Sequence, residues 1–334
     1  MGDVILTTPF IRSLRRAFPE SEIDFVTRKE YAELLLHHPS VSHVVGIDVS
    51  RGIRELLAVN RRFRNAPYDF VYDLHDSART RVLRYRAGKY LRVVRKNRIR
   101  RFLLVRFGIP MPPGIPSVPL RYLATATAEG VQPDAQGPEV FVPQDIRDDT
   151  HRRVSAMLPK GGSPIVGICP GAKHETKRWP VEYFSRIQQR LAGVGARILL
   201  FGGPDEAALC RSLWGNATES TVDLCGTLTL LETAAAMDLC DVIVANDSGL
   251  MHLASARMRP VVALFGCTVR AFGFFPYNTT AVVHEVEGLP CRPCSHIGRM
   301  RCPKKHFRCM KEIDPADVFT SVLRFLPPPP WGGR

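Results

Sequence analysis

The second half of the chain alternates short apolar runs with helical segments, and this alternation limits the fold more than any other feature. Between residues 165 and 283 the apolar runs, such as 241–245, have the aliphatic and β-branched composition of buried strands. Strands that alternate with helices form parallel sheets with helices on both faces. The sequence therefore predicts an α/β protein, and 334 residues leave room for two such domains.

Three polar loops follow these runs, each at the carboxyl end of a predicted strand. Residues 246–252 (Asn-Asp-Ser-Gly-Leu-Met-His) form a polar turn that leads into a helix. Residues 170–180 form a cationic loop with Lys177, and residues 202–206 end on Glu206. Such loops present backbone N–H groups to anions and converge where doubly wound sheets bind ligands. We predict a nucleotide diphosphate site here, although an ordinary N-capped helix would give the first loop the same pattern.

Five stretches, in order along nearly the whole chain, resemble glycosyltransferase family 9, the family of the ADP-heptose:lipopolysaccharide heptosyltransferases. They are residues 1–9, 177–180, 201–206, 247–252 and 264–268. The resemblance implies the GT-B fold, in which two Rossmann-like, doubly wound domains face a cleft. We expect an acceptor-binding domain over residues 1–143, a nucleotide-sugar-binding domain over 144–326 and a disordered tail over 327–334.

The start of the chain departs from the family pattern. In the family, a hydrophobic strand and a short loop precede the Gly-Asp pair, whereas this sequence begins on the Met before Gly2. We therefore expect the first strand of the N-terminal domain to be missing, through a start codon assigned too late or a truncation. A true variant without this strand would leave its two neighbours unpaired.

The first half has weaker patterns than the second. We predict helices over residues 5–17, 31–37, 53–64 and 120–129, and strands over 22–27, 43–47 and 70–74. The basic segment after residue 77 has a mixed pattern, in which residues 103–107 fit a strand or a helix.

The resemblance implies inverting transfer of a sugar from a nucleotide donor to a hydroxyl group. Asp3 matches the catalytic base; its alternative role is to cap a helix that begins near residue 5. Lys177 and the turn at Ser248 and Gly249 would stabilise the leaving diphosphate. We expect no catalytic metal ion, because an Asp-x-Asp motif is not found in the expected place.

The other expected site residues divide between donor and acceptor. His252 would assist at the diphosphate, and its alternative role is that of a core histidine. Glu206 and Asp247 are candidates for ribose or diphosphate contacts, and the 224–229 loop with Leu228 for the base of an ADP-sugar. His75, Asp76 and Arg79 follow a first-domain strand, so we nominate them for the acceptor.

The charge of the chain is strongly basic and unevenly distributed. The formal net charge is +14, and between Ser77 and Ala128 there is no acidic residue. A solvated helix face usually mixes both signs, and a nucleic-acid site would need a binding motif that we do not find. The third interpretation, an anionic membrane surface or a phosphorylated, carboxylated lipid headgroup, fits best. The resemblance implies such an acceptor, of the inner-core lipid A and Kdo type, at the cytoplasmic face of the inner membrane. We expect a cytoplasmic, peripheral protein, since we find neither a signal peptide nor an apolar run long enough to span a membrane.

Four of the nine cysteines, Cys291, Cys294, Cys302 and Cys309, lie within nineteen residues. The Cys-x2-Cys pair is typical of zinc binding, and four thiolates complete a closed tetrahedral site. Structural zinc is therefore one prediction, and free or redox-active thiols are the other. Disulfides are disfavoured in a reducing cytosol, and an iron–sulfur cluster lacks its usual spacing. We expect the remaining cysteines to be small core residues.

Two other functions remain open from the sequence. One is a GT-B enzyme that uses a UDP- or GDP-sugar, or a sugar-nucleotide epimerase. The other is a basic nucleic-acid-binding protein without enzymatic activity, which would bind any polyanion in a salt-dependent way.

Overall fold

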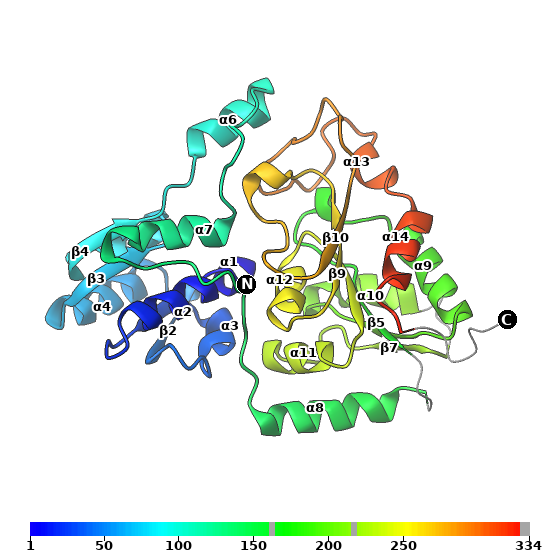
Figure 1. Cartoon of the computed structure of the whole chain (residues 1–334), viewed down its shortest axis with the longest axis horizontal. Helices are drawn as coiled ribbons and strands as arrows, with labels where there is room; N and C mark the ends of the chain where they lie inside the picture. The colour runs from blue at the N-terminus through cyan, green and yellow to red at the C-terminus, as the bar shows by residue number, and fades with distance from the viewer. Residues whose placement is uncertain (160–163, 215–218, 328–334) are drawn as a thin grey trace. The chain divides into compact units, whose positions relative to one another are not determined.

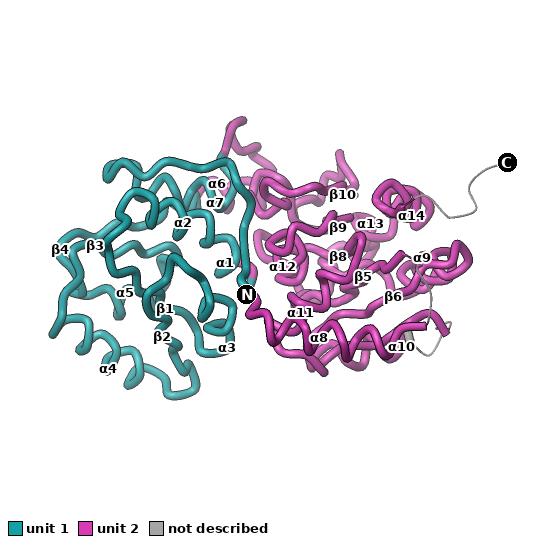
Figure 2. Tube along the Cα trace, turned by 60° about the horizontal axis from the view of Figure 1, so that its bottom comes forward, with its two compact units in different colours: residues 1, 3–98, 116–141 teal, residues 2, 99–115, 142–334 magenta. Residues whose placement is uncertain are grey.

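The computed structural model describes residues 1–159, 164–214 and 219–327. Within these ranges the chain folds into two compact units (Figure 2). The N-terminal unit contains Met1, Asp3–Arg98 and Pro116–Phe141. The C-terminal unit contains Gly2, Ile99–Ile115 and Val142–Arg334.

The C-terminal unit is built on a six-stranded, fully parallel sheet with the strand order β10-β9-β8-β5-β6-β7. The strands are β5 (Ile165–Cys169), β6 (Arg197–Leu200), β7 (Thr221–Asp223), β8 (Val242–Asn246), β9 (Val261–Phe265) and β10 (Ala281–Glu285). The strand order reverses between β5 and β8, the point where ligands bind in open α/β sheets.

Helices cover both sides of this sheet (Figure 1). They are α8 (Gln144–Met157), α9 (Val181–Gly193), α10 (Ala207–Trp214), α11 (Leu230–Met237), α12 (Gly249–Ala256), α13 (Arg308–Lys311) and α14 (Pro315–Leu323). All residues of β5, β8 and β9 are buried. Strands that helices cover on both faces need continuous apolar runs, and these strands have them. The predicted parallel α/β architecture is therefore confirmed for this unit.

The N-terminal unit has no such continuous sheet among its described residues. β1 (Asp24–Arg28) pairs in parallel with β2 (His43–Ile47), and β3 (Tyr68–Asp73) pairs in parallel with β4 (Gly88–Val93), as two separate sheets. Only one edge of β1 and one edge of β3 are therefore paired within residues 1–159.

Short helices surround these strands. They are α1 (Gly2–Ile5), α2 (Thr8–Ala17), α3 (Lys29–Ala32), η1 (Glu33–Leu35), η2 (Val49–Arg51), α4 (Gly52–Asn65), α5 (Ala78–Leu83), α7 (Val118–Leu123) and η3 (Ala124–Glu129). The prediction of a single helix over residues 5–17 is therefore wrong, because the helix is interrupted between α1 and α2. Pro9 lies in the first turn of α2 and cannot donate a backbone hydrogen bond.

Residues 99–115 differ from their predicted place. The predicted boundary at residue 143 places them in the N-terminal domain, but they group with the C-terminal unit. Residues 103–107 lie in helix α6 (Arg98–Phe107). Arg101 explains the grouping, because its guanidinium donates to the carbonyl of Phe272 and lies over the rings of Phe272 and Phe274. The tail predicted over residues 327–334 falls, except for residue 327, outside the described residues.

Within the described ranges, no helix combines the length and apolar composition required to cross a bilayer.

Candidate functional site

Three loops meet at the reversal of the C-terminal sheet, and their side chains form one buried polar cluster. Asp247 follows β8 and is 5% exposed. Its carboxylate accepts from the Nζ of Lys177, in the loop after β5, at 2.7 Å and from the hydroxyl of Thr268, in the loop after β9, at 2.6 Å. The structure therefore brings two predicted site residues together and adds Thr268. The Asp247 carboxylate fixes the lysine near the strand ends, where a diphosphate could reach it.

Asn246 connects the loop after β8 to the Lys177 loop after β5. It is the last residue of β8 and is fully buried. Its Oδ1 accepts from the backbone N–H of Trp179 at 3.0 Å, and its Nδ2 donates to the carbonyl of Pro170 at 2.7 Å. Asn246 thereby holds both ends of the Lys177 loop. Asn246 opens the predicted 246–252 turn but was given no role there, although an amide at the end of an apolar run was a signal, since buried amides need partners.

Helix α12 begins directly beside Asp247. Ser248 is its N-cap residue but makes no side-chain capping bond, and the buried Ser248 hydroxyl has no hydrogen-bond partner within the described ranges. Gly249 is the first helical residue, and the buried His252 follows one turn later. The alternative of an ordinary N-capped helix is wrong, because Ser248 makes no capping bond and the Asp247 carboxylate pairs with Lys177 and Thr268. An unsatisfied hydroxyl beside the free N–H groups of a helix start is a suitable place for an anion.

Glu206 approaches this site from the neighbouring strand β6. It lies in η5 (Pro204–Glu206), and its Oε2 accepts from the backbone N–H of Gly203 at 3.0 Å. A Cβ atom at Gly171 would lie 1.8 Å from Oε1, so the carboxylate packs directly against the Gly171 backbone. Burial raises the pKa of Glu206, although the Gly203 hydrogen bond and the positive charge of Arg178 oppose this rise.

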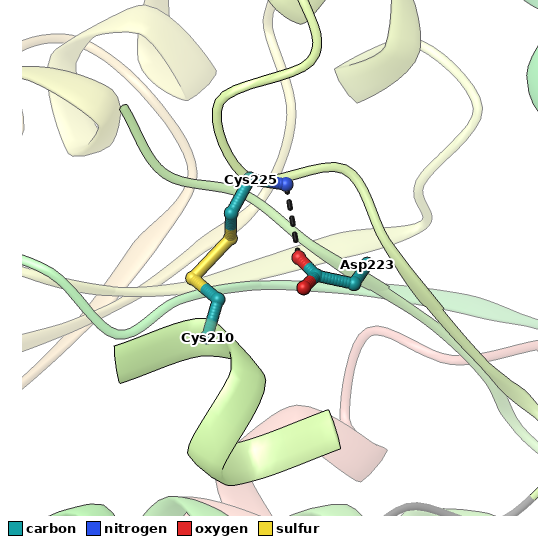
Figure 3. A group of neighbouring side chains, drawn as sticks. All are labelled: Cys210, Asp223 and Cys225. Atoms are coloured by element: carbon teal, nitrogen blue, oxygen red, sulfur yellow. Dashed lines mark hydrogen bonds between the residues drawn. A yellow bond between two sulfur atoms is a disulfide. The ribbon is translucent and has the colours of Figure 1, made fainter. Parts of the chain in front are cut away.

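The predicted base-binding loop lies next to the Glu206 loop. The backbone N–H of Gly226 donates to the carbonyl of Gly202 at 2.9 Å, and Leu228 is half-buried. Cys210 of α10 and Cys225 form a disulfide, and the Asp223 carboxylate accepts from the Cys225 N–H (Figure 3). Both cysteines are buried in the core, as the sequence predicts, but they are joined by a disulfide that it does not predict. Their sequence separation of 15 gave no sign that α10 and this turn bring their Cα atoms within 6.4 Å.

Asp3 belongs to the N-terminal unit and lies in α1, exposed to solvent. Its alternative role as an N-cap is wrong, because α1 contains it and Thr7 precedes α2. Partial burial and the charge of Lys96 lower the pKa of His75, while the carboxylates of Asp3 and Asp73 raise it. Burial also lowers the pKa of Lys96, and Asp3 opposes this shift. Asp3, His75 and Lys96 are thus electrostatic neighbours.

Lys96 was missed because β4 was not recognised in the basic segment. His75 follows β3 and Lys96 follows β4, so they extend from the carboxyl ends of two paired parallel strands. Asp73, the last residue of β3, accepts from the backbone N–H groups of His75 and Asp76. The turn is therefore organised by a buried carboxylate that the sequence analysis did not name.

Asp76 has basic partners, whereas Arg79 points to solvent. The Asp76 carboxylate lies 2.8 Å from Arg98, 3.6 Å from Arg81 and 3.7 Å from Arg84. Arg79 is exposed at the start of α5. Asp76 is thus held in place by the basic segment, which makes it a less direct candidate for acceptor contact than the arginines around it.

The four clustered cysteines line one small cavity together with Cys267, which follows β9. The Cys291 sulfur lies 3.6 Å from Nε2 of His306. A hydrogen bond from Cys294 lowers the pKa of Cys267. Among the described residues, only Cys210, Asp223 and Cys225 place three ligand atoms within 4.8 Å of one another, and two of these form the disulfide.

The sequence and the fold both match known proteins. The model of glycosyltransferase family 9 (heptosyltransferase) matches residues 56–305. Lipopolysaccharide heptosyltransferase 2 of Escherichia coli (strain K12) is 28% identical over 281 residues, which cover 80% of each chain.

Two solved structures share the fold over nearly the whole chain. A family 9 glycosyl transferase from Veillonella parvula DSM 2008 has a TM-score of 0.79 and 23% identity, covering 97% of this chain and 94% of that one. The E. coli ADP-heptose lps heptosyltransferase II has a TM-score of 0.76 and 22% identity, covering 97% and 95%. The predicted GT-B fold is confirmed.

Proposed function

Since the chain belongs to glycosyltransferase family 9, the heptosyltransferase family, we propose that it transfers a heptose, with inversion, from an ADP-sugar to a hydroxyl group of the lipopolysaccharide inner core. The observation that carries this proposal is the Lys177–Asp247–Thr268 cluster at the reversal of the C-terminal sheet. The similarity to E. coli lipopolysaccharide heptosyltransferase 2 supports heptose as the transferred sugar and lipopolysaccharide as the acceptor.

The donor half of the reaction uses positive charge supplied by the protein. As the glycosidic bond breaks, negative charge grows on the leaving diphosphate. Lys177 supplies a cation, and the Ser248 hydroxyl and the N–H groups at the start of α12 supply hydrogen bonds. We infer that these groups replace a catalytic metal ion. Glu206 and the Leu228 loop would hold the nucleoside, with the Glu206 carboxylate accepting from ribose hydroxyl groups.

The acceptor half needs a group that removes a proton from the attacking hydroxyl. Asp3 is a solvent-accessible carboxylate with His75 and Lys96 as electrostatic neighbours. We assign Asp3 as the general base. Lys96 and the exposed Arg79 would attract the phosphate and carboxylate groups of a lipid A and Kdo type acceptor.

Helix α6 fits a role at the membrane where such an acceptor resides. Its exposed apolar side chains include Ile99, at 76% exposure, with Phe102 and Phe107, and its exposed basic ones include Arg100 and Arg106. Apolar and basic groups together bind anionic membrane surfaces. We infer that the protein works at the cytoplasmic face of the inner membrane. The double variant F102A/F107A should lose sedimentation with anionic vesicles, whereas Met157→Ala, another exposed apolar residue, should keep it.

A thermal-shift titration with ADP, UDP and GDP tests the donor site directly. A ligand that binds the native state raises its apparent stability. We expect ADP to stabilise the protein selectively, and Asp247→Asn, which removes the charge that positions Lys177, to abolish the shift. Asp205→Asn, an exposed carboxylate in the Glu206 loop, is the matched control.

The other outcomes separate the remaining functions. A larger shift with UDP or GDP would keep the GT-B transferase and change its donor. No shift with any nucleotide, in protein shown to be folded, would overturn the transferase proposal. Salt-dependent binding to nucleic acid would then support the non-enzymatic alternative.

A further inference from the structure

The cysteine cavity gathers more metal-binding groups than a hydrophobic core would. Five thiols, from Cys267, Cys291, Cys294, Cys302 and Cys309, line a space of about 10 Å³ together with the imidazole of His306. Such a space is about the size of a single water molecule. Cys291, Cys294 and Cys302 are only half-buried, so they are not ordinary core residues.

The five thiols are also not joined in pairs. All five are free, unlike Cys210 and Cys225 in the same unit. They come from different parts of the chain, since Cys267 follows β9, whereas Cys309 lies in α13. The fold therefore directs separate segments to one point, and soft sulfur ligands of this kind select zinc or iron among the common metals.

We propose that this cavity is a thiolate-bound metal centre with Cys291, Cys294, Cys302 and Cys309 as its ligands. Each thiol gives its proton to solvent as its metal–sulfur bond forms. One zinc ion, with bonds of roughly 2.3 Å, would draw the sulfur atoms to roughly 3.8 Å from one another. In the described residues no three of them lie within 4.8 Å of one another. The sulfur atoms therefore have to move closer together when one zinc ion binds.

Cys267 has a different role, because it links the cavity to the Lys177 loop. Its sulfur accepts from the Thr176 hydroxyl at 3.3 Å. The backbone N–H of Thr176 donates to the Arg299 carbonyl at 3.1 Å, and the Thr176 hydroxyl oxygen accepts from the Arg299 N–H at 2.8 Å. Thr176 is thus held from the cysteine segment, and it directly precedes Lys177.

Arg292 forms a second link between the same regions. It lies between Cys291 and Cys294, and its guanidinium donates to the carbonyls of Gly266 and Thr268, both at 2.6 Å. Thr268 in turn donates to Asp247. A metal that fixes the cysteine segment would therefore fix Lys177 and Asp247 through Thr176 and Thr268. This second step rests on the proposed donor site.

Metal analysis of the full chain, purified without a chelating tag, tests the centre itself. We expect nearly one zinc per chain, without the acid-labile sulfide and visible absorbance that an iron–sulfur cluster would give. Cys294→Ser and Cys302→Ser should lose the metal, whereas Cys267→Ser and the core control Cys240→Ala should retain it. Metal-free wild-type protein, or full metal content in both ligand variants, would overturn the proposal.

Two further measurements separate misfolding and donor binding from metal loss. Removing the metal from wild-type protein with a chelator should lower its melting temperature, and returning the metal should restore it. ADP affinity should fall in the stripped protein, because Thr176 and Thr268 would then hold Lys177 and Asp247 less firmly. If the loaded protein contains metal but does not bind ADP, the donor proposal fails and the metal centre stands. Unchanged ADP affinity after stripping would overturn the link through Thr176 and Thr268.

Discussion

The two units use the same strand and helix pattern but differ in how completely their sheets are paired. In the C-terminal unit, β5, β8 and β9 each have partners on both sides and are buried throughout. In the N-terminal unit, no residue of β1 is fully buried, and the strands form only two pairs. A continuous sheet can place side chains from neighbouring strand ends at fixed distances, and two separate pairs do this less strictly.

The candidate sites reflect this difference. Lys177, Asp247 and Thr268 extend from three adjacent strands and are already in contact. Asp3, His75 and Lys96 influence one another electrostatically, but Asp3 is solvent-exposed. The C-terminal unit is therefore suited to hold a small, highly charged donor in one orientation. The N-terminal unit is suited to attract a larger anionic acceptor and to supply a base.

The strongest test of this division of labour is Asp3→Asn. The amide cannot accept the proton of the attacking hydroxyl, so kcat should fall on the order of 10²- to 10⁴-fold. The ADP affinity, measured by calorimetry, should stay unchanged because the donor groups lie in the other unit. Glu30→Gln, an exposed carboxylate of the same unit, serves as the control. Weaker ADP binding in Asp3→Asn would show that the division is wrong.

Lys177→Ala tests the donor side with a smaller expected effect. Loss of the cation should reduce kcat on the order of 10²- to 10³-fold, as for other groups that stabilise transition-state charge. Unlike Asp3→Asn, it should also weaken ADP binding. Steady-state kinetics and calorimetry on the same preparation would show both effects. Lys173→Ala removes an exposed lysine from the same loop and is the control. If it lowers kcat as much as Lys177→Ala does, the effect of Lys177→Ala is only a general effect of positive charge.

The pH dependence of ADP binding tests Glu206 within the C-terminal site. Because burial raises its pKa, Glu206 takes up a proton earlier than an exposed glutamate as the pH falls. The protonated form accepts fewer hydrogen bonds, so ADP affinity should weaken about fivefold as the pH falls through this pKa, the equivalent of about one hydrogen bond. Glu206→Gln should remove this dependence. Subtracting the two profiles cancels the titration of ADP itself, and parallel profiles would exclude Glu206 as a ligand.

The sequence predicted the parts of the site that are local in the chain. A strand, a turn and a helix around Asp247 formed as predicted, because apolar runs and a Ser-Gly turn determine such a unit within about fifteen residues. The sheet reversal, which brings the Lys177 and Thr268 loops to Asp247, follows from strand order. The predicted strands could place these loops at one edge, but they could not show that Lys177 and Asp247 pair.

The failures have a common physical cause. β4 was missed because it carries Lys89 and Arg92 and is largely exposed, so its sequence has no apolar alternation. Because β4 was not predicted, the sequence could not place Lys96 at the end of a strand. The Cys210–Cys225 disulfide depends on how α10 packs beside β7, a contact that spacing does not reveal. Long-range partners were therefore lost where local patterns were weak.

The smallest expected effect concerns the contact between the two strand pairs of the N-terminal unit. The Tyr68 hydroxyl, at the start of β3, donates to the carboxylate of Asp24, at the start of β1. Tyr68→Phe should lower the free energy of unfolding by about 1 kcal/mol, the usual contribution of a partly buried hydrogen bond. In the C-terminal unit, Tyr183→Phe removes an exposed hydrogen bond to the Lys311 carbonyl and should cost less. Urea unfolding followed by far-UV circular dichroism measures both. If Tyr68→Phe costs no more than Tyr183→Phe, this hydrogen bond does not help to hold the strand pairs together, and packing between them must do so.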